Sequence, residues 1–217
     1  MLTLVKGWRQ IMTWNWLGWL LWLGALVYLC WVIHYIRVHQ LMLIAKTGNR
    51  LDKMLMAKYV GFLLVAFCWV GGMYYLTFAR SVDYRDQAAV KVTTQYAPLQ
   101  LSSAGGDYYY VLGNKSAGGK HQVASYTYAT ATRKNTVSAR YATVVTTDEL
   151  IPADARDYPW PAARLQKEDR NTTHAFVATM DVTYRNTILN GLGLRVNRPA
   201  GQYTLLRIPA PGLLKEQ

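Results

Sequence analysis

WNWLGWLLWLGALVYLCWVIHYI, residues 14–36, and YVGFLLVAFCWVGGMYYLTFA, residues 59–79, decide the fold. Each stretch has at least 20 residues without Lys, Arg, Asp or Glu, and a helix of that length crosses a hydrocarbon core of roughly 30 Å. Lipid offers no hydrogen-bond partner to an open backbone, so such a segment crosses a bilayer as a helix. The sequence therefore predicts two transmembrane helices joined by a short basic connector, residues 37–58.

The rest of the chain has the pattern of a β-rich domain. Its clearest strand has Phe176, Ala178, Met180, Val182 and Tyr184 on one face and Thr179, Asp181 and Thr183 on the other, as a strand with one buried side requires. We expect a transmembrane helical hairpin over residues 1–80, then a β-rich domain over 81–208, and a loose tail over 209–217. The domain is predicted to be an antiparallel sheet or a small sandwich with a minor helical part.

Runs of β-branched and aromatic residues separated by turn residues mark the individual strands. A three-residue turn, Arg133 to Asn135, is expected to join two of them as a hairpin, and a short helix is expected over residues 162–167. The expected strands are residues 89–96, 108–112, 122–132, 136–147, 174–184 and 203–208.

The net charge is +12 and is shared between the two parts of the chain. Residues 1–79 hold seven Lys and Arg against one acidic residue, and the remainder holds seventeen against eleven. The first share suits anionic lipid headgroups, so the lipid bilayer is an expected partner. The second suits an anionic envelope polymer. No helix-turn-helix, zinc-finger or single-strand-binding motif accompanies the charge, so we do not expect nucleic acid as a partner.

Charge also bears on orientation in the membrane. The connector carries five Lys and Arg in 22 residues, including Arg50 and Lys53, while the flanks on the other side also carry five. The connector charges are concentrated in one short loop, which favours a cytoplasmic connector by the positive-inside rule. We therefore expect a multi-pass cell-membrane protein with two helices and an extracytoplasmic β domain.

Signals for catalysis are poor. Cys30 and Cys68 both lie in the apolar stretches, so the domain has no cysteine nucleophile and no disulfide. Residues 113–121 imitate a phosphate-binding loop, but the glycine spacing fails and a strand pattern follows, so we expect a glycine-rich hairpin tip. The histidines of the domain, His121 and His174, have no nearby His or Cys at metal-ligand spacing. We expect no enzyme activity, no cofactor and no metal.

A binding function is the better expectation for the domain. Exposed tyrosine and arginine offer large contact area and several hydrogen-bond donors. The function predicted is therefore a membrane-anchored, non-enzymatic β domain that contacts cell-envelope polymer or a partner protein. The candidate binding residues are Tyr108, Tyr109, Tyr110, Tyr126, Arg195 and Arg198.

The alternative gives the active part to the hairpin, as an accessory subunit of a transporter, secretion or immunity system. Trp16, Trp19 and Trp22 follow one side of the first helix and suit lipid or a partner helix. Ala57 and Gly61 form a small-xxx-small pair on the second helix, which favours close helix packing with a membrane protein partner or in a homo-oligomer.

The chain resembles uncharacterised two-pass membrane proteins of lactic-acid bacteria. The resemblance depends on the Trp-rich first span (WNWLGWLLWLG and WVIHYIR), the short basic connector, and a Thr- and Tyr-rich domain after YYLTFAR. It implies a cell-surface setting and brings no activity or site residues.

Overall fold

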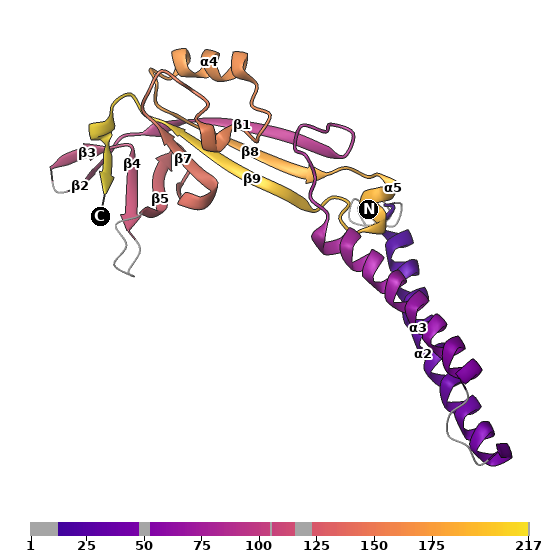
Figure 1. The fold of residues 1–217 in the computed structure, drawn as a ribbon. Helices are drawn as coiled ribbons and strands as arrows, with labels where there is room; N and C mark the ends of the chain where they lie inside the picture. The colour runs from indigo at the N-terminus through magenta and orange to yellow at the C-terminus, as the bar shows by residue number, and fades with distance from the viewer. Residues whose placement is uncertain (1–12, 48–52, 105, 116–122, 217) are drawn as a thin grey trace, which may run out of the picture. The chain divides into compact units, whose positions relative to one another are not determined.

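The computed structural model describes residues 13–47, 53–104, 106–115 and 123–216, which fall into two compact units (Figure 1). One unit comprises Met1–Val82 with Tyr184–Arg198, and the other comprises Asp83–Thr183 with Pro199–Gln217. Residues 184–198 are therefore an insert between two strands of the β domain that groups with the apolar helices.

The two apolar helices of the first unit are confirmed. They are α2 (Asn15–Thr47) and α3 (Lys53–Tyr74), and α3 continues into a π-helical turn, η1 (Tyr75–Ala79). Both are long and apolar enough to cross a membrane. The first continues beyond its apolar stretch to Thr47, so residues 37–47 of the expected connector are helical.

A seven-residue spacing marks the buried side of each helix. Ala25 and Val32 are buried on α2, and Tyr59, Ala66 and Met73 are buried on α3. Residues seven apart return to the same side of a helix that packs against a neighbour in left-handed coiled-coil fashion. The two helices therefore meet along one continuous seam.

Aromatic rings fill this seam between the small residues. Tyr28 lies 6.0 Å from Trp69, and Tyr35 meets Phe62 edge to face at 5.4 Å, both measured between ring centroids. Because lipid tails are as apolar as side chains, close packing rather than the hydrophobic effect must hold such helices together. Edge-to-face rings supply packing of that kind.

The insert contains a short helix, α5 (Ile188–Leu192), that rests on the first turns of α2. A Cβ atom on Gly18 would lie 2.5 Å from the carbonyl oxygen of Gly191, and one on Gly191 would overlap Trp14. Only glycine allows the two backbones to approach this closely. The sequence analysis did not anticipate this helix.

The second unit contains one mixed sheet of eight strands that forms a half-barrel. The strand order is β10-β4-β5-β1-β8-β9-β7, with β6 beside β5, and β2 and β3 form a separate ribbon (Figure 1). The β-rich domain with minor helix is thus confirmed, as one sheet rather than a sandwich. It is not purely antiparallel, because β10 pairs with β4 and β7 pairs with β9 in parallel. The strands are β1 (Val90–Gln100), β2 (Ser102–Ala104), β3 (Asp107–Tyr109), β4 (Val111–Lys115), β5 (Val123–Thr130), β6 (Lys134–Ser138), β7 (Ala142–Val145), β8 (Phe176–Tyr184), β9 (Pro199–Arg207) and β10 (Leu214–Glu216).

Two expected elements differ at the β5–β6 hairpin and after it. The turn precedes the expected position: Arg133 ends it, with the Thr130 N–H donating to the Arg133 carbonyl over 2.9 Å, and Lys134 already belongs to β6. The long strand expected over 136–147 is split by a 3-10 turn, η2 (Ala139–Tyr141). The Ser138 hydroxyl accepts from the Arg140 N–H and so caps that turn.

The C-terminal tail is more ordered than predicted, and the expected short helix is longer than predicted. Residues 209–217 were expected to be loose, but they contain a 3-10 turn, η4 (Pro211–Leu213), and strand β10. Pairing with β4 orders this tail, because Leu214 lies opposite Val111. The expected short helix is α4 (Ala162–Asn171), one turn longer than predicted.

Side chains pack on both faces of β8 and β9. The predicted buried face is confirmed, since Phe176, Ala178, Met180 and Val182 are all fully buried and Tyr184 is half-buried. The opposite face was expected to be exposed, but Val177 is buried there as well. Arg164 of α4 lies over the Tyr96 ring of β1, and Asp169 of α4 bonds to Arg207 of β9, so this helix covers the sheet. The other face holds a cluster of buried apolar side chains: Leu99, Val111, Tyr128, Ala175, Val177, Leu206 and Ile208.

Candidate functional site: a tyrosine pocket in the β domain

Three tyrosine rings stack in a row beside β9. Tyr84, which precedes β1, stacks on Tyr158 at 5.0 Å between ring centroids, and Tyr158 contacts Tyr203 of β9 at 4.8 Å. Hydrogen bonds hold the two outer rings in place. The Tyr84 hydroxyl donates to the Ala200 carbonyl over 3.2 Å, and the Tyr203 hydroxyl forms a hydrogen bond with Thr143 Oγ1 of β7. The row is therefore held at both ends by the sheet.

A glycine in β9 makes room for the first ring. A Cβ atom at residue 201 would lie 2.8 Å from the Tyr84 hydroxyl oxygen and 2.9 Å from its Cζ. Gly201 thus allows Tyr84 to lie directly against the strand, where its hydroxyl reaches the neighbouring carbonyl of Ala200.

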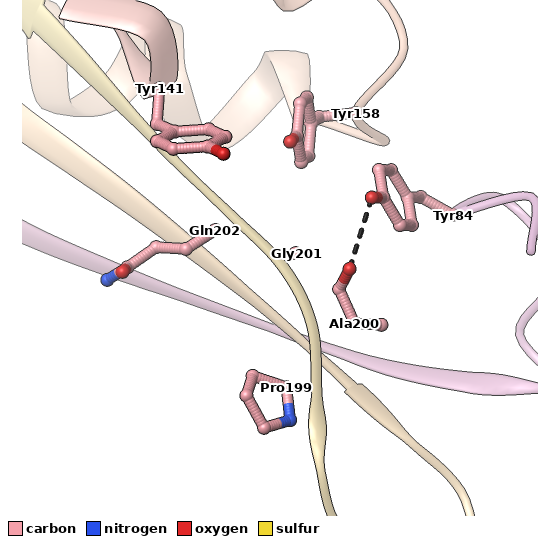
Figure 2. A pocket seen from close by; sticks show the side chains of 7 residues that line it. All are labelled: Tyr84, Tyr141, Tyr158, Pro199, Ala200, Gly201 and Gln202. Atoms are coloured by element: carbon pink, nitrogen blue, oxygen red, sulfur yellow. Dashed lines mark hydrogen bonds between the residues drawn. The ribbon is translucent and has the colours of Figure 1, made fainter. Parts of the chain in front are cut away.

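An open pocket of about 400 Å³ lies at this row (Figure 2). Figure 2 shows the rings of Tyr84, Tyr141 and Tyr158 above the β9 backbone, with the Gln202 amide at the other side. Small-molecule sites usually combine aromatic walls with a few polar groups that fix orientation. The lining residues are Tyr84, Tyr141, Tyr158, Pro199, Ala200, Gly201 and Gln202.

The phenol of Tyr158 keeps its proton over the physiological range. Burial, with the neighbouring phenols of Tyr84 and Tyr203, raises the pKa of Tyr158 to about 12. Burial also raises the pKa of Tyr203, against the hydrogen bond to Thr143, which lowers it. Desolvation disfavours the phenolate because the charged form loses its water. The phenol of Tyr158 is therefore unsuited to proton transfer near neutral pH, and the pocket can stack against a ligand and donate hydrogen bonds to it.

A second cavity, of about 290 Å³, lies next to α4 at a cluster of Asp169, Arg207 and His174, of which the first two are buried and His174 is exposed. Asp169 Oδ1 accepts from Arg207 Nε over 3.1 Å, and Asp169 Oδ2 lies 2.8 Å from His174 Nδ1. An Asp–His pair can support catalysis when it activates a nucleophile. No serine, threonine or cysteine lines this cavity in the described part of the chain. The cluster is best explained as a structural contact that holds α4 on the sheet.

The tyrosines that the sequence suggested do not gather in one site. Tyr108 and Tyr109 are successive residues of β3, so they point to opposite faces. Tyr108 is exposed, but the expected exposure of Tyr109 is wrong, since it is buried. Tyr110 and Tyr126 are half-buried against the apolar cluster. A binding role for these residues stays a prediction.

The two suggested arginines lie in the insert, with the helical unit. The expected exposure of Arg195 is wrong: only 8 % of the residue is exposed. Its Nε donates to the Thr77 carbonyl over 3.0 Å, and an Nη donates to the Tyr184 hydroxyl over 3.2 Å. Its guanidinium therefore supplies hydrogen-bond donors to carbonyl groups at the end of η1. Arg198 is exposed, as expected.

The suggested hairpin positions lie outside the seam between the helices. Trp16 and Trp19 are exposed and Trp22 is half-buried on α2, while Ala57 and Gly61 are exposed on α3. No atom lies within 4 Å of a Cβ built at Gly61. Small residues do line the seam, but they are Ala25 and Ala66. Contact of the suggested residues with lipid or with another chain stays a prediction.

A family model matches residues 13–215, which is nearly the whole chain. The chain belongs to this family. The family is named after a Lactobacillus locus and is uncharacterised, which agrees with the resemblance to proteins of lactic-acid bacteria. No curated protein and no solved structure matches the chain.

The sequence analysis did not single out the pocket tyrosines of this family member. Tyr84, Tyr141 and Tyr158 come from three turns far apart in the chain, and only folding brings them to β9. One signal was available in the run Tyr158-Pro159-Trp160-Pro161. Trp160 is buried and donates from Nε1 to the Ala155 carbonyl over 3.0 Å, so this proline-rich loop is an ordered part of the domain.

Proposed function

We propose that the protein anchors a non-enzymatic β domain on the extracytoplasmic side of the cell membrane, where the tyrosine pocket binds a saccharide unit of an envelope polymer. The observation that carries the proposal is a pocket lined by three tyrosine rings, Tyr84, Tyr141 and Tyr158, with the Gln202 amide beside them. The apolar face of a sugar ring stacks on aromatic rings, and its hydroxyls can bond to the Gln202 amide and to the phenols.

Charge narrows the ligand further. Among the described residues, no Lys, Arg, Asp or Glu lines the pocket, so the bound unit should itself be neutral. Residues 80–217 hold seventeen Lys and Arg against eleven Asp and Glu, which disfavours a cationic ligand and favours a polymer with phosphate or carboxylate groups elsewhere along its length. A neutral sugar within an anionic polymer meets both conditions.

The binding test uses purified cell-wall sacculi of a lactic-acid bacterium, intact or stripped of their phosphate-containing polymers. The full chain in detergent should sediment with the intact sacculi, with the stripped sacculi, or with both, and the comparison shows whether the phosphate-containing polymers carry the bound unit. Tyr141 lines the pocket and is 53 % exposed, whereas Tyr108 is 64 % exposed and lies outside it. Tyr141→Ala should weaken binding by about 2 kcal/mol, or roughly thirtyfold, and the matched control Tyr108→Ala should not. Equal losses for the two variants, or no sedimentation with either preparation, would refute a saccharide pocket.

Orientation has its own test. Single cysteines at Ser103 and Lys53, both exposed residues, replace the native Cys30 and Cys68 as the only thiols. A membrane-impermeant thiol reagent on intact cells should label residue 103 and not residue 53. The reverse result would place the domain in the cytoplasm and remove the envelope from consideration.

The alternative function, an accessory subunit acting through the hairpin, is favoured by the open face of α3. At Gly61, Gly71 and Gly72, a Cβ atom would have no neighbouring atom within 4 Å. Glycines on a helix surface allow a partner helix to approach closely, because they have no side chain. A photo-crosslinker at Gly61 should then capture one defined membrane protein. Adducts with lipid alone would favour the anchor.

A further inference from the structure

A cavity of about 520 Å³ lies where the insert meets the start of α2. All of its lining residues belong to the helical unit. They are Thr13, Asn15, Trp16, Trp19, Val196, Asn197 and Arg198.

The wall of this cavity is fixed by a two-point clamp. Asn15 Nδ2 donates to the Val196 carbonyl over 3.3 Å, and the Val196 N–H donates back to Asn15 Oδ1 over 3.2 Å. Leu194 and Asn197, on either side of the clamped residues, have left-handed backbones with φ of 57° and 62°. A leucine in this conformation is costly and persists only where surrounding contacts hold it. The backbone that forms this wall of the cavity is therefore held in one conformation by its contacts.

The cavity also lies at a defined depth. Trp16 and Trp19 belong to the first two turns of a helix whose apolar span begins at Asn15, and they are 51 % and 65 % exposed. Exposed tryptophans at the end of a membrane span sit at the level of the lipid headgroups. That placement holds for either orientation of the protein, because both leaflets have a headgroup layer.

The lining carries positive charge and no negative charge. Arg198 is exposed and is the one charged residue among those that line the cavity in the described chain. Its planar guanidinium can hold a phosphate through two parallel N–H bonds. Without a carboxylate among the described lining residues, the cavity offers no full negative charge to the ammonium of a zwitterionic headgroup.

We propose that this cavity binds the phosphate of an anionic phospholipid such as phosphatidylglycerol. Arg198 binds the phosphate, the indoles of Trp16 and Trp19 contact the glycerol and upper acyl region, and the Asn15 clamp holds the insert in place. This site is independent of the tyrosine pocket and of the envelope ligand proposed for it.

The test measures thermal unfolding of the delipidated full chain in a maltoside detergent. Added phosphatidylglycerol should raise the unfolding midpoint, because a ligand that binds only the folded state stabilises it. Phosphatidylcholine and inorganic phosphate at equal concentration should raise it much less. Arg198→Gln should weaken the apparent affinity for phosphatidylglycerol about tenfold. Arg185→Gln is the matched control, since Arg185 is an exposed arginine of the same insert outside the cavity.

Three outcomes would overturn the proposal. Equal loss of affinity in the two arginine variants would mean diffuse attraction of anionic lipid to a basic surface. An equal response to phosphatidylcholine would remove the preference for an anionic headgroup. An equal response to inorganic phosphate would mean that the cavity takes free anion rather than lipid. Both substituted residues are exposed, so circular dichroism should show an unchanged fold in each variant.

Discussion

Arg195→Ala should release the insert from the helices. The guanidinium of Arg195 donates to the carbonyls of Thr77 and Arg80 and to the hydroxyl of Tyr184. The two carbonyls belong to the end of η1 and the residue after it, where helix carbonyls have no partner within the helix. An arginine from residue 195 thus completes the end of a helix that is more than 110 residues away in sequence.

The cost follows from the bonds lost. A hydrogen bond from a charged group contributes about 1.5–3 kcal/mol, and two of the three bonds of Arg195 serve carbonyls that alanine would leave without it. Water can reach part of this site once the side chain is removed, so we take the lower end, about 3 kcal/mol in total. That energy corresponds to roughly a hundredfold larger population of the undocked insert.

Hydrogen exchange measured by mass spectrometry on the chain in lipid nanodiscs reports this population directly. Amides of the insert are protected in the docked state: the Gly191 N–H bonds to the Thr187 carbonyl over 2.8 Å, and the Arg195 N–H bonds to the Asn190 carbonyl over 2.8 Å. A peptide covering residues 186–197 should exchange about a hundredfold faster in Arg195→Ala, while Arg185→Ala should match the parent. Unchanged exchange in Arg195→Ala would show that the helix end does not depend on this guanidinium.

Three further predictions concern the β domain. The phenol of Tyr158 ionises near pH 12 in the folded state and near 10 when unfolded, so stability should fall as pH rises between these values, and Tyr158→Phe should make the decline shallower in urea titrations. Gly201→Ala should displace the Tyr84 ring, leaving the unfolding midpoint nearly unchanged while weakening binding to the sacculi; unchanged binding would separate Tyr84 from the pocket's function. Asp169→Ala should leave Arg207, with 5 % of its side chain exposed, as an uncompensated buried cation, which costs about 3–5 kcal/mol and should lower the unfolding midpoint; a midpoint near the parent value would contradict this.

The elements that were predictable are those whose pattern is local. The two apolar helices follow from length and absence of charge in residues 14–36 and 59–79, and strand β8 follows from the alternation of Phe176 through Val182. In both cases the surroundings require apolar side chains at regular positions: all along a helix in lipid, and at every second residue of a strand with a buried face. The sequence alone carries that information.

Elements that depend on a distant partner were missed. β10 exists because Leu214 pairs with Val111, and α5 has a place because Gly18 and Gly191 allow close approach. Five residues are too few for a periodic signal, and a three-residue strand shows none. The burial of Arg195 has the same origin, because its acceptors are backbone carbonyls that leave no trace in side-chain patterns.

The same limit applied to the candidate site. Tyr84 lies in a turn before the first predicted strand and Tyr158 in a loop between two predicted strands, whereas the sequence analysis favoured tyrosines inside strands, such as Tyr109. Tyrosines within strands mostly pack, and Tyr109 is buried accordingly. Loops supply the groups that remain free to line a pocket, but nothing local shows which loops converge.

The path of the chain between the two units has a consequence for how firmly the domain is retained by the cell. A domain on one stalk is shed by a single proteolytic cut, yet here the backbone passes between the units three times, after residues 82, 183 and 198. A protease that cleaves only after residue 82 leaves the domain attached through the insert, which the bonds of Asn15 and Arg195 keep on the helices. Such a nicked protein should still fractionate with the membrane. In the extracytoplasmic orientation proposed above, the domain would thus stay on the cell that made it even where extracellular proteases are active.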